Sequence, residues 1–183
     1  MSDTLHDMFL DELRDAYDAE KQITKALPKM IKAVTSATLK RGLEAHLKET
    51  EGQIGRLEKA FGLLDKKVKG KHCDGMEGIL KEGSAVLEED LDGVTLDACI
   101  IASAQRVEHY EMAAYGTLVA WARAMEHEEV AGLLEKTLNE EKAADAKLSA
   151  AAEGGINDEA ATLAHSGDDV EPVAVGTGAK KRN

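Results

Sequence analysis

Apolar residues recur at steps of three and four along most of the chain, which is the spacing of amphipathic α-helices. In the first predicted helix, from about residue 3 to the mid-thirties, the apolar stripe consists of Leu5, Phe9, Leu13, Ala16, Ile23, Leu27, Ile31 and Val34. Pro28 lies within this stripe and predicts a kink or a division, because a proline inside a helix removes one backbone hydrogen bond. The sequence TSAT at 35–38 then provides a turn and the N-cap of the next helix.

Further helices follow, and the same periodicity predicts them over about 38–64, 74–90, 95–125 and 127–152. Sequences rich in Lys, Gly and Asp separate these segments, and the sequence EGG ends the last one. No run of alternating β-branched residues predicts a strand. The pattern therefore predicts an all-α fold, with residues 1–153 as one helical bundle and residues 154–183 as a flexible or peripheral tail.

The two halves of the bundle repeat each other at a shift of 91 residues. This shift superimposes Glu20 on Glu111 and Glu49 on Glu140, and it pairs several leucines: Leu5 with Leu96, Leu27 with Leu118, Leu43 with Leu134, Leu47 with Leu138, and Leu57 with Leu148. Each half is then a pair of helices with a glutamate on both members. The shorter intervening helix is predicted to be a crossover that joins two similarly oriented hairpins into a four-helix bundle.

Composition narrows the classes of function. Of the 183 residues, 43% are hydrophobic and only 3% are aromatic, and the net charge is −12. An acidic surface repels phosphate backbones, so we expect no nucleic-acid partner. The N-terminal sequence lacks the basic and apolar regions of a signal peptide, no apolar run reaches membrane-spanning length, and the two cysteines have no ligand spacing. We therefore expect a cytoplasmic protein with no membrane partner.

Several carboxylates fall on the apolar side of the predicted helices, where an unpaired charge is costly. Glu20 lies within the stripe of the first helix, and Glu108 and Glu111 lie within that of the fourth. Glu141 shares a face with apolar residues of the last helix. The remaining candidates lie nearer the edges of the stripes and are His46, Glu49 and Glu140.

All of these candidates lie near the middle of their helices, and in an antiparallel bundle such positions meet at one level. Crowded carboxylates cannot all ionise unaided, because burial and mutual repulsion raise their pKa values. Divalent cations remove this conflict, and oxygen ligands with an occasional nitrogen suit Fe or Mn. The pattern therefore favours a site for two Fe or Mn ions in the bundle core.

Each position also has a simpler interpretation. A single inward glutamate can pack its methylene groups and extend its carboxylate to water, which applies best to Glu49 and Glu140. His46 can be a hydrogen-bonded residue at the edge of the core. Tyr17 and Tyr115 can be core aromatic residues, or either can be a hydrogen-bonding or radical neighbour of a metal. The combination of several inward glutamates with the internal repeat favours the metal site.

Five segments carry a resemblance to a known family: DAEKQ around Glu20, HLKETEGQ at 46–53, HCDGMEGILKEG in the crossover, QRVEHYEMAAYGTL at 105–118 and LEKTLNEEKAADAKL at 134–148. In these segments the chain resembles the YciE/YciF-type family of bacterial ferritin-like proteins, over about residues 3–152. The resemblance implies a ferritin-like four-helix bundle related to rubrerythrins. It also implies a homodimer and a link to bacterial stress responses.

The chain departs from the ferritin-like pattern in its histidines. In the wider superfamily the second and fourth bundle helices each carry Glu-x-x-His, but here Gly52 follows Glu49 by three residues and an alanine follows both Glu140 and Glu141. Carboxylate ligation therefore carries over from the resemblance, whereas the usual histidine ligands do not. A site poorer in nitrogen would bind more weakly, prefer Mn or lack a redox role.

Two hypotheses follow. In the first, the chain is a di-metal carboxylate protein in which Fe(II) is oxidised by O₂ or peroxide during oxidative or metal stress, and the paired Glu108-x-x-Glu111 resembles the paired glutamates of rubrerythrins. In the second, it is a non-enzymatic, stress-induced scaffold or interaction protein with a degenerate or empty metal site. A cage for iron storage fits less well, because the tail and the dimeric habit of the family argue against a closed shell.

Overall fold

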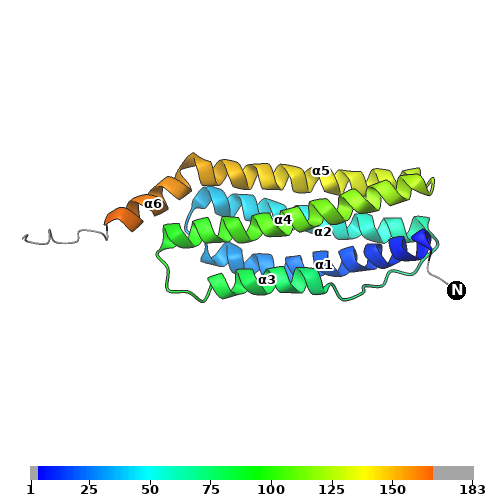
Figure 1. Cartoon of the computed structure of the whole chain (residues 1–183), viewed down its shortest axis with the longest axis horizontal. Helices are drawn as coiled ribbons and strands as arrows, with labels where there is room; N and C mark the ends of the chain where they lie inside the picture. Colours follow the sequence, from blue (N-terminus) through cyan, green and yellow to red (C-terminus); the bar gives the residue numbers. More distant parts are fainter. Residues whose placement is uncertain (1–3, 167–183) are drawn as a thin grey trace, which may run out of the picture.

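The computed structural model describes residues 4–166, which form helices joined by short connections (Figure 1). The elements are α1 (Leu5–Ala33), α2 (Ala37–Leu63), α3 (Asp74–Val86), α4 (Gly93–Ala124), α5 (Glu128–Ala151), the π-helical segment η1 (Ala152–Ile156) and α6 (Asn157–Ser166). Within the described residues there is no strand. The all-α prediction is confirmed.

The four long helices form a bundle in which each helix packs against two others: α1 against α2 and α4, and α5 against α2 and α4. The shorter α3 lies outside this ring and packs against α1 and α4 (Figure 1). It connects the α1–α2 hairpin to the α4–α5 hairpin. The predicted four-helix bundle with a crossover helix is therefore the observed architecture.

Capping residues define where the helices begin. The side chain of Thr4 accepts a hydrogen bond from the backbone N–H of Asp7, and the Asp7 carboxylate accepts one from the backbone N–H of Thr4 at 2.9 Å. This reciprocal pair satisfies two otherwise free donors at the start of α1. At the start of α2, the Ser36 side chain accepts from the backbone N–H of Leu39, as the TSAT turn predicted.

A buried aspartate ties the two hairpins together at the α1–α2 turn. Asp97 of α4 accepts hydrogen bonds from the backbone N–H groups of Thr35 and Ser36, at 2.8 and 2.7 Å, and from the Thr35 hydroxyl at 2.7 Å. The chains approach closely here, because a Cβ atom at Gly93 would lie 2.7 Å from the Thr35 side chain. Asp97 thus sets the position of the α1–α2 turn relative to α4.

The structure corrects two details of the predicted helix boundaries. Pro28 does not divide α1, which continues to Ala33. Pro28 is exposed, so the helical bond that it removes lies toward solvent, where water can replace it. The crossover helix ends at Val86, a few residues before the predicted end.

The core has an apolar cluster on either side of the bundle centre. Residues of one cluster include Ile23, Leu27, Met30, Leu39, Leu43, Ile100, Ile101 and Val107. Residues of the other include Phe9, Leu13, Leu57, Phe61, Tyr115, Leu118, Val119 and Leu134. These clusters contain apolar residues of the stripes that the sequence predicted. Together they exclude water from the part of the core that lies between them.

The last described residues extend the bundle beyond α5. Gly155, within η1, has φ 132°, a conformation that favours glycine, and the chain then continues as α6, which contacts α4. The predicted tail therefore contains a helix in its described part, and its remaining residues, 167–183, lie outside the described residues. Among the helices of residues 4–166, none combines the length and apolar character needed to cross a bilayer.

Candidate metal centre

A layer of polar side chains separates the two apolar clusters. Its residues, all buried, are Glu20, His46, Thr50, Gln53, Glu108, Glu111, Thr137 and Glu141. They come from the middle parts of all four bundle helices, and both Glu20 and Glu141 are 0% exposed. The layer therefore combines charged groups with an environment that excludes water.

Four residues of this polar layer bring potential ligand atoms together. One atom each from His46, Glu108, Glu111 and Glu141 lies within 4.8 Å of the other three. The Nε2 atom of His46 lies 3.4 Å from Oε1 of Glu108. Helices α2, α4 and α5 contribute this group, whose carboxylate oxygens and imidazole nitrogen are donors that Fe and Mn accept.

Glu20 enters the same layer from α1. The hydroxyl group of Tyr115 donates a short hydrogen bond to Oε1 of Glu20, while Oε2 of Glu20 has no hydrogen-bond partner. Tyr115 thus orients the carboxyl group and leaves one of its oxygens available. Tyr115 also packs in an apolar cluster of the core, as one of its two predicted roles requires, and its role beside a metal stays a prediction.

The two remaining candidates, Glu49 and Glu140, lie at the edge of the layer with side chains 33% and 32% exposed. Each is paired with a cation across the α2–α5 contact. The Nζ atom of Lys147 lies 3.6 Å from Oε1 of Glu49, and Arg56 donates two hydrogen bonds to Glu140, one of them at 2.8 Å. The internal shift of 91 residues superimposes Arg56 on Lys147, so the two ion pairs are counterparts in the repeat.

Burial is the main cause that raises the pKa of the carboxyl groups in the layer. The pKa of Glu20 rises to about 8, with the charge of Glu141 as the second cause, and that of Glu108 rises to about 10, with the carboxyl group of Glu141 as its second cause. The pKa of Glu141 rises to about 7 and that of Glu111 well above its ordinary value. Without cations, the layer therefore retains protons near neutral pH.

The same burial shifts the pKa of His46 in the opposite direction from the pKa values of the carboxyl groups. Burial lowers its pKa to about 4, and the charge of Lys147 lowers it further, against the effect of Glu140. The imidazole is therefore neutral near pH 7, which is the form that binds a metal.

The unpartnered atoms of the layer fit a metal site. Within the described residues, the buried side-chain atoms without a hydrogen-bond partner include Glu20 Oε2, Glu108 Oε2, both carboxyl oxygens of Glu111, Glu141 Oε2 and both ring nitrogens of His46. Buried polar atoms are normally satisfied, and without a cation these oxygens can be satisfied only by protons shared between neighbouring carboxyl groups, Glu20 with Glu111 and Glu108 with Glu141. Divalent cations would satisfy these atoms, whereas apolar neighbours cannot.

The sequence interpretation assigned no role to several supporting residues. Gln53 donates hydrogen bonds to Glu141 and, at 3.2 Å, to Glu140, and Arg56 holds Glu140. Both residues follow Glu49 at helical spacing, by four and seven positions, which was the available signal. Their partners on α5 are distant in sequence, so only the packed structure identifies them.

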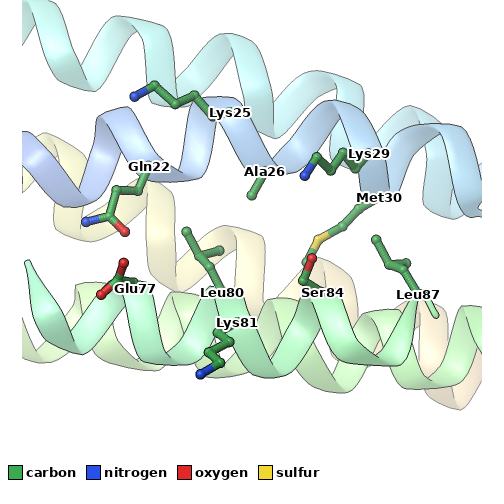
Figure 2. Close-up of a pocket in the computed structure, with 10 residues that line it drawn as sticks. All are labelled: Gln22, Lys25, Ala26, Lys29, Met30, Glu77, Leu80, Lys81, Ser84 and Leu87. Carbon is green, nitrogen blue, oxygen red and sulfur yellow. The ribbon is translucent and has the colours of Figure 1, made fainter. Parts of the chain in front are cut away.

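Two other features lie away from the layer. His72, Asp74 and Glu77 also bring ligand atoms within 4.8 Å of one another, but all three residues are exposed and each carboxylate already has water available. A hollow of about 620 Å³ lies between α1 and α3, lined by Lys25, Lys29 and other residues (Figure 2). Its lining contains no residue of the polar layer, so the hollow is separate from the chemistry described above.

Comparisons with known proteins agree with this architecture. Residues 4–161 match the family model described as Domain of unknown function (DUF892). Protein YciF of Escherichia coli (strain K12) is 42% identical over 158 residues, which cover 86% of this chain and 95% of that protein.

Two solved structures resemble the whole bundle. The structure of the E. coli stress protein YciF has a TM-score of 0.82 at 41% identity and covers 85% of this chain and 99% of its own. The structure of YcfI from Rhodopseudomonas palustris has a TM-score of 0.79 at 49% identity and covers 80% of this chain and 94% of its own. The chain therefore belongs to the DUF892 family and is a relative of the YciF-type stress proteins.

Proposed function

We propose that the polar layer binds two divalent cations, Fe or Mn, and that the protein acts in oxidative or metal stress. The observation that carries this proposal is the convergence of His46, Glu108, Glu111 and Glu141 within 4.8 Å in a buried layer. The relative from E. coli is named a stress protein, which agrees with the proposed role.

Charge balance supports the binding of two cations per chain. The layer holds four buried glutamates, Glu20, Glu108, Glu111 and Glu141, and His46 is neutral. Ionising all four creates four negative charges in a dry environment, and two divalent cations neutralise them. A single cation would leave two carboxyl groups that must retain protons or remain unpaired.

The residues of this chain would hold the cations and their surroundings in place. Glu108, Glu111 and Glu141 supply oxygen ligands together with His46, and Tyr115 orients Glu20. Gln53 positions the Glu141 carboxylate by its hydrogen bond, while the apolar clusters exclude water. When bound, Fe or Mn would supply redox chemistry toward O₂ or peroxide.

For the partners and the compartment we propose what the sequence predicted. We propose a homodimer that works in the cytoplasm, with O₂ or peroxide as the small-molecule substrate and no nucleic-acid or membrane partner. A net charge of −12 agrees with the absence of a nucleic-acid partner.

Metal content tests the proposal directly. Untagged protein is purified without chelator, and Fe and Mn are counted per chain by mass spectrometry before and after anaerobic addition of Fe(II). We expect about two ions per chain, and we expect Glu111→Gln and Glu141→Gln to lose most of this metal. The exposed Glu51→Gln on α2 is the matched control and should retain it. No uptake by the unaltered protein would refute the proposal.

A second candidate function is a helical scaffold without a metal. The observation that favours it is the engagement of Glu140 by Arg56, which removes one carboxylate from the potential ligands. In a scaffold the buried carboxyl groups stay protonated and pair with each other. Substituting both Glu108 and Glu111 by alanine would then only destabilise the protein, whereas a metal site predicts a more stable metal-free protein that no longer binds metal.

A further inference from the structure

A pocket of about 390 Å³ opens between α2 and α5 and reaches the polar layer. The buried residues His46 and Glu108 line its inner part, and the more exposed Glu49 and Lys147 line it nearer the surface. A divalent cation with six waters needs roughly 180 Å³, at about 30 Å³ per water, so the pocket has room for a hydrated ion. The pocket therefore joins the solvent to the proposed metal centre.

The two ion pairs across the α2–α5 contact are counterparts in the internal repeat, but they differ in strength. Arg56 donates two hydrogen bonds to Glu140, and its side chain is 20% exposed. Lys147 is 60% exposed, and its Nζ atom lies 3.6 Å from Oε1 of Glu49, beyond the usual length of a hydrogen bond. A bidentate arginine pair holds its geometry, whereas an exposed lysine pair contributes little to stability and exchanges readily. The weaker pair is the one that lines the pocket.

The positions beside these two ion pairs also differ. The shift of 91 residues superimposes Gln53 on Ala144. The fully buried Gln53 side chain donates hydrogen bonds to Glu140, at the edge, and to Glu141, in the layer, so it spans the distance between them. At the equivalent place on the other side, Ala144 has only a methyl group and lines the pocket. A hydrogen-bonded side chain therefore blocks the way to the layer at one ion pair, and the way is open at the other.

His46 connects the outer part of the pocket to the layer. Its Nδ1 atom lies 3.9 Å from Oε2 of Glu49, and its Nε2 atom lies 3.4 Å from Oε1 of Glu108. Neither ring nitrogen has a hydrogen-bond partner. On the opposite side, the repeat places Thr137 at this position. Donor atoms that suit Fe or Mn thus follow one another from a half-exposed carboxylate to a buried one.

We propose that the Glu49–Lys147 pair is the entrance through which the divalent cations reach the polar layer. Glu49 exchanges Lys147 for an incoming cation, and His46 and Glu108 then accept it. Glu49 is thereby an entry residue and not a final ligand, which accounts for its place at the edge of the layer. The inference rests on the proposed function and adds the route by which its site is filled.

The rate of metal uptake tests the proposal. Metal-free, full-length protein is mixed with Mn(II), uptake is stopped with excess chelator after set times, and the Mn retained per chain is counted by mass spectrometry. Glu49→Gln should take up Mn(II) about tenfold more slowly, because the entrance loses the carboxylate that attracts the cation, and should reach the same final content. Lys147→Gln should take up Mn(II) severalfold faster, because Glu49 is then free of its competing cation.

Two control variants make the same changes of charge on the same helices. Glu51→Gln on α2 and Lys142→Gln on α5 replace exposed residues that do not line the pocket. Both should take up Mn(II) at the rate of the unaltered protein. If each control changed the rate as much as its counterpart, overall charge would set the rate and the proposed entrance would be wrong.

The final content and the rate separate the two proposals. Full content in the unaltered protein, with a rate that neither Glu49→Gln nor Lys147→Gln changes, would refute the entrance and keep the metal centre. A lower final content in Glu49→Gln would make Glu49 a ligand and would also overturn the entry role. No Mn in the unaltered protein would refute the metal centre and the entrance together.

Discussion

The protonation of Glu20 contributes to the stability of the metal-free bundle. Glu20 is fully buried, and its pKa rises from 4.5 to about 8 on folding, mainly because of burial. Below pH 4.5 the group is protonated in both the folded and unfolded chain, so it costs nothing. As the pH rises toward 8, the unfolded chain ionises while the folded chain retains the proton, and the free energy of unfolding falls.

The magnitude follows from the difference between the two pKa values. At about pH 7.5, the pH lies about three units above the unfolded pKa, and each unit corresponds to about 1.36 kcal/mol. The cost is therefore up to about 4 kcal/mol. Glu20→Gln removes this cost, because glutamine resembles the protonated carboxyl group and its carbonyl can still accept the Tyr115 hydrogen bond. A domain of this size should gain about 10 °C in melting temperature.

Thermal unfolding of chelator-treated protein at pH 4.5 and pH 7.5 measures the effect. Glu20→Gln should raise the melting temperature at pH 7.5 and have little effect at pH 4.5, whereas the exposed control Glu51→Gln should change neither. With Mn(II) present the order should reverse, because the variant loses a ligand. A gain at both pH values, or destabilisation at pH 7.5, would refute the assignment of this cost to the buried carboxyl group.

Three further predictions concern the supporting structure and the metal. Arg56→Met should lower the free energy of unfolding by about 1–2 kcal/mol, because it leaves the partly buried Glu140 without its cation, and a urea midpoint that does not change would contradict this. Asp97→Asn should cost about 2–3 kcal/mol in the same assay, because asparagine cannot accept all three hydrogen bonds from Thr35 and Ser36 as a charged group does. Binding of Mn(II) at pH 7 should release protons into weakly buffered solution, because the carboxyl groups must ionise to bind, and uptake without proton release would show that they were already ionised.

Much of the fold follows from local sequence. Periodic apolar residues predicted five helices, and side chains such as Thr4 and Ser36 mark the beginnings of α1 and α2, because capping involves only neighbouring residues. The 91-residue repeat predicted the crossover and the pairing of like hairpins. The boundaries near Val86 and Gly155 were less predictable, because helix ends depend on contacts that a periodic pattern does not describe.

The candidate site was predictable in part. Glu20, Glu108, Glu111 and Glu141 stand among apolar residues in the sequence, and all four are buried. His46 lies at the edge of its stripe, so the sequence left its role open, and the structure places its imidazole beside Glu108. Burial of a side chain follows from helical periodicity because that pattern repeats every 3.6 residues along one helix.

By itself, the sequence determined the helices, their apolar faces and the level at which charged residues enter the core. Only the tertiary structure decided which of these residues meet. The rotation and register of packed helices pair Arg56 with Glu140, Lys147 with Glu49 and Tyr115 with Glu20. The physical reason is that periodicity constrains one helix at a time, whereas these contacts join atoms on different helices and depend on how all four pack together.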